Sequence, residues 1–174
     1  MLTRLNRGLH SILSHAGTRL YATACVVVAD VALARLTYSN AGHPKPFHDR
    51  RSDEQMVVLD GGKGPALGLF EEARYTTAHA DLTPGDGLIL FTDGLFEVED
   101  PSGTLYSQQD LLVAARRHGA RPMTERLDAL LAEVRTYTAR SAFDDDVCLI
   151  GMEVAARGNG SVAAPAAGSN GGES

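Results

Sequence analysis

A series of short apolar segments, separated by turn-forming residues, most constrains what this chain can fold into. Tyr21–Ala29 is apolar and β-branched, and it is too continuous for an exposed strand, so it predicts a strand in the core. Leu33–Ser39 alternates between apolar and polar residues and predicts its hairpin partner. Gly87–Phe91 predicts a second buried strand, and Val147–Val154 predicts the last one. Strands joined by short turns indicate antiparallel sheets.

Between these strands, the turn residues divide the chain further. Pro44 and its neighbours in Asn40–Pro44 predict a break in the sheet, and Thr83–Asp86 predicts a turn. The remaining expected elements are short strands around Phe47, over Met56–Leu59 and over Ala73–His79, with a loop at Gly61–Pro65.

Three segments have apolar residues at the spacing of an amphipathic helix. Apolar residues from Leu2 to Leu13 recur at helical spacing, and Gly17 is expected to end that helix. Gln108–His118 and Thr124–Thr138 predict two more helices, with Ser107 placed to cap the first of them. Strands followed by helices indicate an α+β domain, which we assign to residues 1–154. Residues 155–174 are mainly Gly, Ala, Ser, Asn and Pro, which predicts a disordered tail.

Composition excludes several classes of function. The net charge is −6 and the pI is about 5.4, which argues against nucleic acid as a partner. The longest apolar stretch, Ala22–Ala29, is far shorter than the ~20 residues that a membrane span needs. Cys25 and Cys148 show no paired spacing and are expected to be buried free thiols. The N-terminus lacks the pattern of a signal peptide, so we expect a cytoplasmic protein with no membrane partner.

Acidic residues stand at the ends of two predicted strands. Asp93 and Gly94 directly follow the strand at Gly87–Phe91, and Asp144–Asp146 directly precede the last strand. Rigid strand ends could hold these carboxylates close together, and oxygen ligands of this kind suit Mg²⁺ or Mn²⁺. The alternative is that Asp93 is an ordinary turn residue and Asp144–Asp146 a solvated turn, because acidic turns are common.

Three motifs, in order along the chain, resemble those of the PPM-type (type 2C) serine/threonine phosphatases, in particular their bacterial SpoIIE-like branch. Leu82–Glu97 resembles the family's strand with Gly-Asp before it and Thr-Asp-Gly after it. Leu36–Pro44 resembles the hairpin that ends in Asn-Ala-Gly-His-Pro, and Phe143–Ile150 resembles the closing Asp-Asp strand, with Cys148 where the family usually has Thr. The resemblance covers Leu5 to Val154.

The resemblance implies a two-layer antiparallel β-sandwich flanked by helices, with two Mn²⁺ or Mg²⁺ ions between the sheet edges. By the same resemblance, Asp93 and Asp145 are the catalytic, metal-binding residues, and both serve the same ion. The resemblance also implies that Asp146 and Gly94 lie next to the ligands without binding the metal, and that Asp146 orients water or Asp145. Three further residues, Asn40, Gly42 and His43, correspond to a loop that borders the site. In this loop Asn40 and Gly42 are expected to be mainly structural.

The implied activity is hydrolysis of phosphoserine or phosphothreonine on a partner protein of the anti-anti-sigma-factor type, by metal-activated water. By the same resemblance, the family's first metal motif, an Asp-Gly pair, lies upstream of the first helix, where this sequence has only residues 1–4. We therefore expect the chain to represent the C-terminal portion of such a domain. Because Asp93 and Asp145 alone supply few ligands, a non-catalytic regulatory module that binds a partner is the alternative function.

Overall fold

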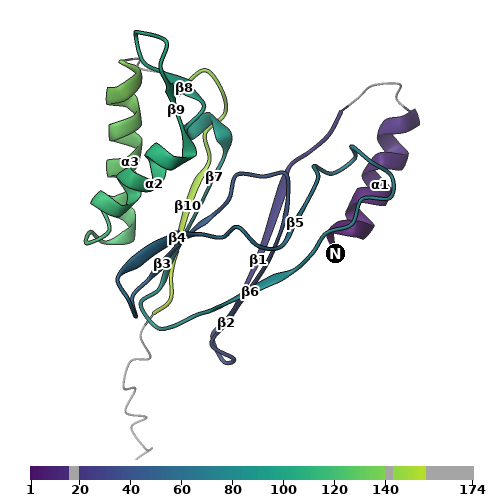
Figure 1. Ribbon diagram of the computed structural model, residues 1–174, viewed down its shortest axis with the longest axis horizontal. Coiled ribbons are helices and arrows are strands. Elements are labelled where there is room, and N and C mark those ends of the chain that lie inside the picture. Colours follow the sequence, from purple (N-terminus) through teal and green to yellow (C-terminus); the bar gives the residue numbers. More distant parts are fainter. Residues whose placement is uncertain (16–19, 140–142, 156–174) are drawn as a thin grey trace, which may run out of the picture.

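In the computed structural model, which describes residues 1–15, 20–139 and 143–155, two four-stranded sheets pack against each other (Figure 1). Helices lie on the outer faces of both sheets. All strand pairs are antiparallel except one two-residue pair, so the predicted α+β class with antiparallel sheets is confirmed. The predicted helix end at Gly17 and the predicted disorder after Ala155 lie outside the described residues.

The first sheet is built around β2 (Arg35–Ala41), which pairs with three neighbours. On one side β2 forms a hairpin with β1 (Ala24–Asp30), in a register that runs from Ala24 opposite Ala41 to Asp30 opposite Arg35. On the other side β2 pairs with β5 (Lys63–Gly64) in parallel and with β6 (Ala78–Asp81) in antiparallel orientation. The predicted partnership of the first two strands is therefore confirmed.

The second sheet has the strand order β10-β7-β3-β4. Its strands are β3 (Phe47–Arg50), β4 (Gln55–Val58), β7 (Gly87–Phe91) and β10 (Leu149–Glu153). A short helix, η1 (Asp93–Leu95), follows β7, and a separate pair of two-residue strands, β8 (Val98–Glu99) and β9 (Leu105–Tyr106), lies beyond it.

The pleat of β7 explains how the second sheet packs on both faces. Leu88 points into the core between the two sheets, while Ile89 and Phe91 point to the helical side. The buried residues between the sheets are Leu36, Tyr38, Leu59, Leu82, Leu88 and Val154. Because β7 is buried on both faces, its sequence is apolar throughout.

Helices α2 (Gln108–Arg117) and α3 (Met123–Thr138) cover the outer face of the second sheet. The Ser107 side chain accepts a hydrogen bond from the Asp110 amide, and the Asp110 carboxylate accepts one from the Ser107 amide. This reciprocal capping box satisfies amide groups at the start of α2 and confirms the predicted cap.

Helix α1 (Leu2–His15) is fastened to the first sheet by a buried amide. Asn6 is completely buried, and its Nδ2 donates to the carbonyls of Phe70 and Glu71 at 2.8 and 3.1 Å. Its Oδ1 accepts from the Gly68 amide at 2.8 Å and from the Tyr75 hydroxyl at 3.1 Å. One side chain therefore connects the helix to the segment that follows β5.

Several predicted boundaries are wrong. The segment expected as a core strand forms β1, an edge strand that begins only at Ala24 and contains no buried residue. The sheet does not break at Asn40, because Asn40 and Ala41 still pair within β2. The expected loop after Gly61 contains β5, and the strand expected over Ala73–His79 occupies 78–81 instead.

Cys25 and Cys148 are free thiols, as expected, but neither is buried. Cys25 is half-buried in the edge strand β1, where burial raises its pKa to about 11. Cys148 is exposed just before β10, which is one of the two edge strands of the second sheet. In the described ranges no helix is both long enough and apolar enough to cross a membrane.

Candidate functional site

The end of β7 and the start of β10 meet at one edge of the second sheet. The two strands are antiparallel neighbours, with Phe91 opposite Leu149. Asp93 follows Phe91 closely, and Asp145 and Asp146 come shortly before Leu149. The two acidic segments that the sequence singled out are therefore brought together by strand pairing.

Thr92 fastens these two segments to each other. Its Oγ1 donates to the Asp146 carbonyl at 2.9 Å and accepts from the Cys148 amide at 2.8 Å. The Thr92 amide also donates to the Cys148 carbonyl at 3.0 Å. These hydrogen bonds extend the β7–β10 ladder past its last registered pair. They fix the backbone beside Asp93 relative to the backbone of Asp146.

Gly94 allows the closest approach of the two segments. A Cβ at this position would lie 2.8 Å from the carbonyl oxygen of Asp146 and 3.3 Å from the carbonyl carbon of Asp145. The first separation is shorter than carbon and oxygen atoms tolerate without a shift of the backbone. The site therefore requires glycine at this position, for space rather than for backbone conformation.

Asp93 and Asp145 each use one carboxylate oxygen in a local hydrogen bond. Oδ1 of Asp93 accepts from the Gly94 amide at 3.1 Å, and Oδ1 of Asp145 accepts from the Asp146 amide at 2.7 Å. Asp145 is exposed and Asp93 is half-buried. Within the described part of the chain, the remaining Oδ2 of each residue makes no hydrogen bond, so both carboxylates keep an oxygen available for a ligand.

The loop of Asn40, Gly42 and His43 is stabilised by hydrogen bonds between the Asn40 side chain and the His43 backbone. Nδ2 of Asn40 donates to the His43 carbonyl, and the His43 amide donates to Oδ1 of Asn40, both at 2.8 Å. Gly42 has φ = +68°, and a Cβ there would lie 3.0 Å from the Ala66 amide nitrogen. Asn40 and Gly42 therefore shape the loop that presents His43.

His43 connects this loop to Asp93 electrostatically. Partial burial lowers the pKa of His43, and the negative charge of Asp93 partly offsets this effect. The Nδ1 atom of His43 lies 2.9 Å from the Thr23 hydroxyl, just before β1. The structure thus brings His43 within the electrostatic reach of Asp93, whereas Asn40 turns its side chain into the loop.

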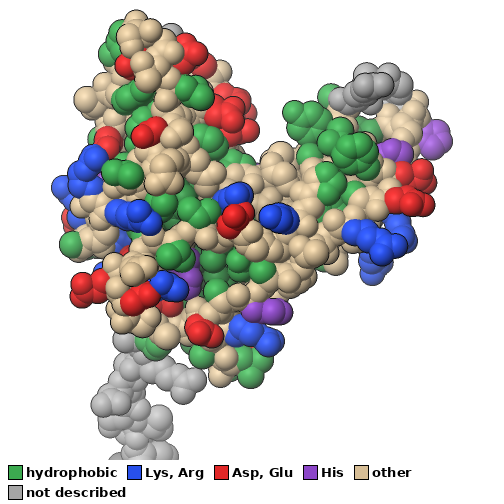
Figure 2. Space-filling view, in the orientation of Figure 1, with side chains coloured by type: hydrophobic (Ala, Val, Ile, Leu, Met, Phe, Trp, Pro, Cys, Tyr) green, Lys and Arg blue, Asp and Glu red, His purple; other side chains and the backbone are tan. Residues whose placement is uncertain are grey.

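The molecular surface has a hollow on the face drawn in Figure 2. Figure 2 shows this hollow between the part that carries α2 and α3 and the part that carries α1, with acidic side chains on the α2–α3 side.

The donor set suits one hydrated divalent cation. Mg²⁺ commonly binds to proteins through one or two carboxylates and keeps several water ligands, and Asp93 and Asp145 provide two such carboxylates. Among the described residues, no group of three or more His, Cys, Asp or Glu side chains is arranged to hold a metal. The described residues alone therefore do not supply all the ligands of the two-ion centre that the resemblance implies for a complete domain.

Two residues have structural roles that their sequence pattern does not predict. Thr92 belongs to the Thr-Asp-Gly motif, and its hydroxyl, directly after a buried strand, is suited to bonding the neighbouring strand. Asp86 belongs to the predicted turn Thr83–Asp86, yet it is 2% exposed and accepts hydrogen bonds from the Thr83 and Arg51 amides and the Thr83 hydroxyl. Its Oδ2 also lies 3.1 Å from Nε2 of His48, which is completely buried.

The model of the family "Stage II sporulation protein E (SpoIIE)" matches residues 1–155. The chain is 28% identical over 155 residues to the phosphoserine phosphatase RsbP of Bacillus subtilis, covering 88% of the chain and 36% of the relative. It is 31% identical over 112 residues to the phosphoserine phosphatase RsbU of the same organism, covering 63% of the chain and 33% of the relative. The chain thus spans about a third of the length of these two curated relatives.

Solved structures share the fold at low sequence identity. The RsbU and RsbW domains of Rv1364c from Mycobacterium tuberculosis give a TM-score of 0.67 at 24% identity, covering 84% of this chain and 41% of that one. The phosphatase domain of SpoIIE from B. subtilis gives a TM-score of 0.59 at 19% identity, covering 90% of this chain and 72% of that one. The family match and this shared fold confirm the resemblance seen in the motifs: the chain belongs to the SpoIIE family and has the fold of its PPM-type phosphatase domains.

Proposed function

We propose that this chain carries part of the active site of a metal-dependent phosphatase that hydrolyses phosphoserine or phosphothreonine on a partner protein. The observation that carries the proposal is the junction of β7 and β10. There the Thr92 hydroxyl bonds the Asp146 carbonyl, and Gly94 lies against the same peptide. This junction holds two carboxylates with available oxygens, Asp93 and Asp145, at one edge of a rigid sheet.

In this proposal Asp93 and Asp145 hold Mg²⁺ or Mn²⁺. When bound, such an ion lowers the pKa of a water ligand and offsets the charge on the phosphoryl oxygens. Asp146 and Gly94 keep the two carboxylate segments in place through their backbone contact. His43 is presented by the Asn40–Gly42 turn, and partial burial lowers its pKa, which favours the uncharged form of the ring beside a cation.

We infer a protein substrate of the anti-anti-sigma-factor type in the cytoplasm. The names of RsbP and RsbU, both phosphoserine phosphatases, support a phosphoserine ester as the bond that is cleaved. The exposure of Asp145 supports a substrate presented on a folded protein. The net charge of −6 argues against nucleic acid.

A second candidate is a regulatory module that binds a phosphoprotein partner without hydrolysing it. The supporting observation is the small donor set, since the described residues supply carboxylates for one hydrated ion and no cluster of three ligating side chains. Such a module would keep the surface near Asp93 and Asp145 but lack turnover.

Release of inorganic phosphate from a phosphoserine peptide in the presence of Mn²⁺ separates these candidates. We expect turnover by the chain that is lost on Asp93→Asn and retained in Asp128→Asn, which removes a carboxylate from the exposed surface of α3. Activity that survives Asp93→Asn contradicts the proposed site. Absence of turnover in all variants, with retained binding of the phosphopeptide, favours the binding module.

A further inference from the structure

The three aspartates that precede β10 form a short exposed segment between two apolar residues. This acidic segment, Asp144–Asp146, is exposed throughout. Phe143 stands directly before it and Val147 directly after it, and both side chains are half-buried and pack against the core beneath α2 and α3. The acidic segment is therefore attached to that core at both ends, and the position of Asp145 depends on how firmly each end is held.

The end that follows Asp145 is held by hydrogen bonds to the neighbouring strand. The Thr92 hydroxyl donates to the Asp146 carbonyl and accepts from the Cys148 amide. The registered pairs of β10 and β7 begin one residue later. This end of the acidic segment is therefore fixed by the sheet itself.

The end that precedes Asp145 is held by an aromatic ring and a cation. The guanidinium of Arg135 lies over the ring of Phe143, with 5.7 Å between its Cζ atom and the ring centroid. A guanidinium within about 6 Å of a ring centroid is attracted by the negative face of the ring. Arg135 is exposed in the last turn of α3, so its side chain covers Phe143 from the solvent side. The contact joins α3 to the start of the acidic segment.

The ring of Phe143 is the contact that the guanidinium of Arg135 makes. Across residues 1–15, 20–139 and 143–155, no carboxylate lies at salt-bridge distance from Arg135. A cation in the last turn of a helix also stabilises the helix end. Lysine can fill that role as well as arginine, whereas the planar group of arginine stacks on a ring in a way that lysine does not. The two roles of Arg135 can therefore be separated by substitution.

We propose that Arg135 is a positioning residue for Asp145. By covering Phe143 it fixes the start of the acidic segment, and it thereby sets where the available Oδ2 of Asp145 lies relative to Asp93. Its role in metal binding rests on the proposed function, because it assumes that Asp93 and Asp145 hold the ion. The fixing of the segment does not depend on that assumption, and it can be measured without metal.

Amide hydrogen exchange of the metal-free chain, followed by nuclear magnetic resonance, tests whether Arg135 fixes the segment. The Asp146 amide donates to Oδ1 of Asp145 at 2.7 Å, whereas the Thr92 amide donates to the Cys148 carbonyl at the end of the sheet. In Arg135→Ala we expect the Asp146 amide to exchange about three times faster, as the loss of an exposed cation–π contact implies. The Thr92 amide should keep its rate. Equal acceleration of both amides, or of neither, overturns the proposal.

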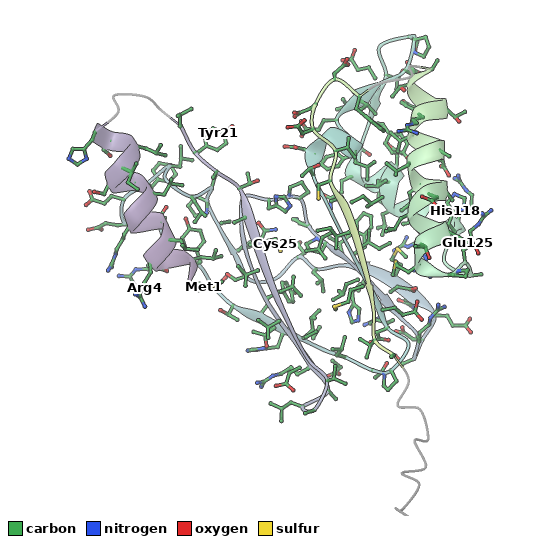
Figure 3. All side chains as sticks on the ribbon, turned by 180° about the vertical axis from the view of Figure 1, so that it is seen from behind. Met1, Arg4, Tyr21, Cys25, His118 and Glu125 are labelled. Atoms are coloured by element: carbon green, nitrogen blue, oxygen red, sulfur yellow. The ribbon has the colours of Figure 1, made fainter. Side chains whose placement is uncertain are left out.

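Mn²⁺ binding gives a second readout, whose sign separates positioning from charge. Removal of a positive charge near a cation site strengthens binding if charge is the only effect, whereas loss of positioning weakens it. We expect the dissociation constant for Mn²⁺ to rise about threefold in Arg135→Ala, and not to rise further when Asp145→Asn is already present. Figure 3 shows Arg4 on α1, on the other side of the molecule from α3. Arg4 is exposed, and Arg4→Ala makes the same change in charge, so this control should bind Mn²⁺ normally.

Two further variants test the contact itself. Phe143→Leu keeps an apolar anchor but removes the ring, so Arg135→Ala should add no effect in that background. Arg135→Lys keeps the charge at the end of α3 and should keep the midpoint of unfolding in urea, yet it should restore only part of the protection of the Asp146 amide. Full recovery of that protection in Arg135→Lys assigns the effect to the charge at the helix end and overturns the proposal.

The positioning role and the proposed function fail separately in these measurements. Unchanged or tighter Mn²⁺ binding in Arg135→Ala, together with a loss of binding in Asp145→Asn, overturns the positioning role and leaves the metal site standing. Unchanged Mn²⁺ binding in Asp145→Asn contradicts the proposed function instead. In that case the hydrogen exchange of the Asp146 amide still decides whether Arg135 fixes the acidic segment.

Discussion

The backbone of Gly94 lies directly against the carbonyl of Asp146, closely enough that a Cβ on Gly94 would stand 2.8 Å from that oxygen. This contact joins the turn after β7 to the turn before β10. The site therefore depends on backbone packing as much as on its carboxylates.

Gly94→Ala should push these two turns apart. Overpacking of a close contact costs about 1–3 kcal/mol of unfolding free energy, and part of that strain will fall on Asp93 and Asp145. We expect a lower denaturation midpoint in urea and weaker Mn²⁺ binding. As a control, Gly103→Ala changes a turn glycine with φ = +82° and open space around it, and it should affect stability but not Mn²⁺ binding. Equal metal affinity in Gly94→Ala and the unmodified chain would show that the contact does not position the site.

Thr92→Val should leave two backbone groups without their partner. The Asp146 carbonyl and the Cys148 amide both bond the Thr92 hydroxyl, and loss of a partner for such groups costs about 1–3 kcal/mol. Thr92→Ser keeps the hydroxyl and should retain most of the stability. Urea unfolding of both variants gives the comparison. A Val variant as stable as the Ser variant would mean that water replaces the hydroxyl fully.

Asn6→Ala should detach α1 from the first sheet. The substitution removes bonds to the carbonyls of Phe70 and Glu71 and to the groups of Gly68 and Tyr75. With several buried groups left unpaired, we expect a loss of several kcal/mol, on the basis of about 1–3 kcal/mol for each group. Amide hydrogen exchange should accelerate in α1 first. Uniform acceleration across the chain would indicate instead that α1 unfolds only with the whole domain.

Asp86 should make the fold sensitive to acid. Burial opposes ionisation of this carboxyl, but hydrogen bonds from Thr83, Arg51 and His48 outweigh burial and lower its pKa below the ordinary value for aspartate. A lowered pKa in the folded state contributes stability that is complete above the unfolded pKa and is lost as the pH falls through the folded one. Stability should therefore decline below about pH 4, and Asp86→Asn should flatten that decline. Thermal unfolding between pH 2 and 6 measures it, and an identical acid profile for Asp86→Asn would exclude this carboxyl as the cause.

The sequence predicted those elements whose pattern differs sharply from their surroundings. The uniformly apolar strand at Gly87–Phe91 and the helix with its Ser107 cap have the observed bounds to within a residue. The predictions from the sequence are wrong where the local pattern of a segment and its position in the sheet disagree. The valines of β1 look like a core strand, but only the pairing order shows that β1 is at an edge. β5 is a two-residue strand that contains Gly64, so no periodicity could reveal it.

The candidate site was predicted from its motifs only in part. The sequence indicates that acidic residues at two strand ends could lie close together, and the β7–β10 pairing brings the segments of Asp93 and of Asp145 and Asp146 to one edge of the sheet. The hydroxyl bridge of Thr92 could not be foreseen, because it depends on where the Asp146 carbonyl points after β10 is registered. The roles of Asp93 and Asp145 as ligands of one ion stay predictions.

Titration of Mn²⁺ by electron paramagnetic resonance tests the central claim most directly, because it reports binding whether or not the chain turns over. We would compare the full chain with Asp93→Asn, Asp145→Asn, the double variant and the surface control Asp128→Asn. If Asp93 and Asp145 share one ion, each single variant should weaken binding nearly as much as the double variant, and the control should bind normally. Unchanged Mn²⁺ affinity in the double variant would contradict the account.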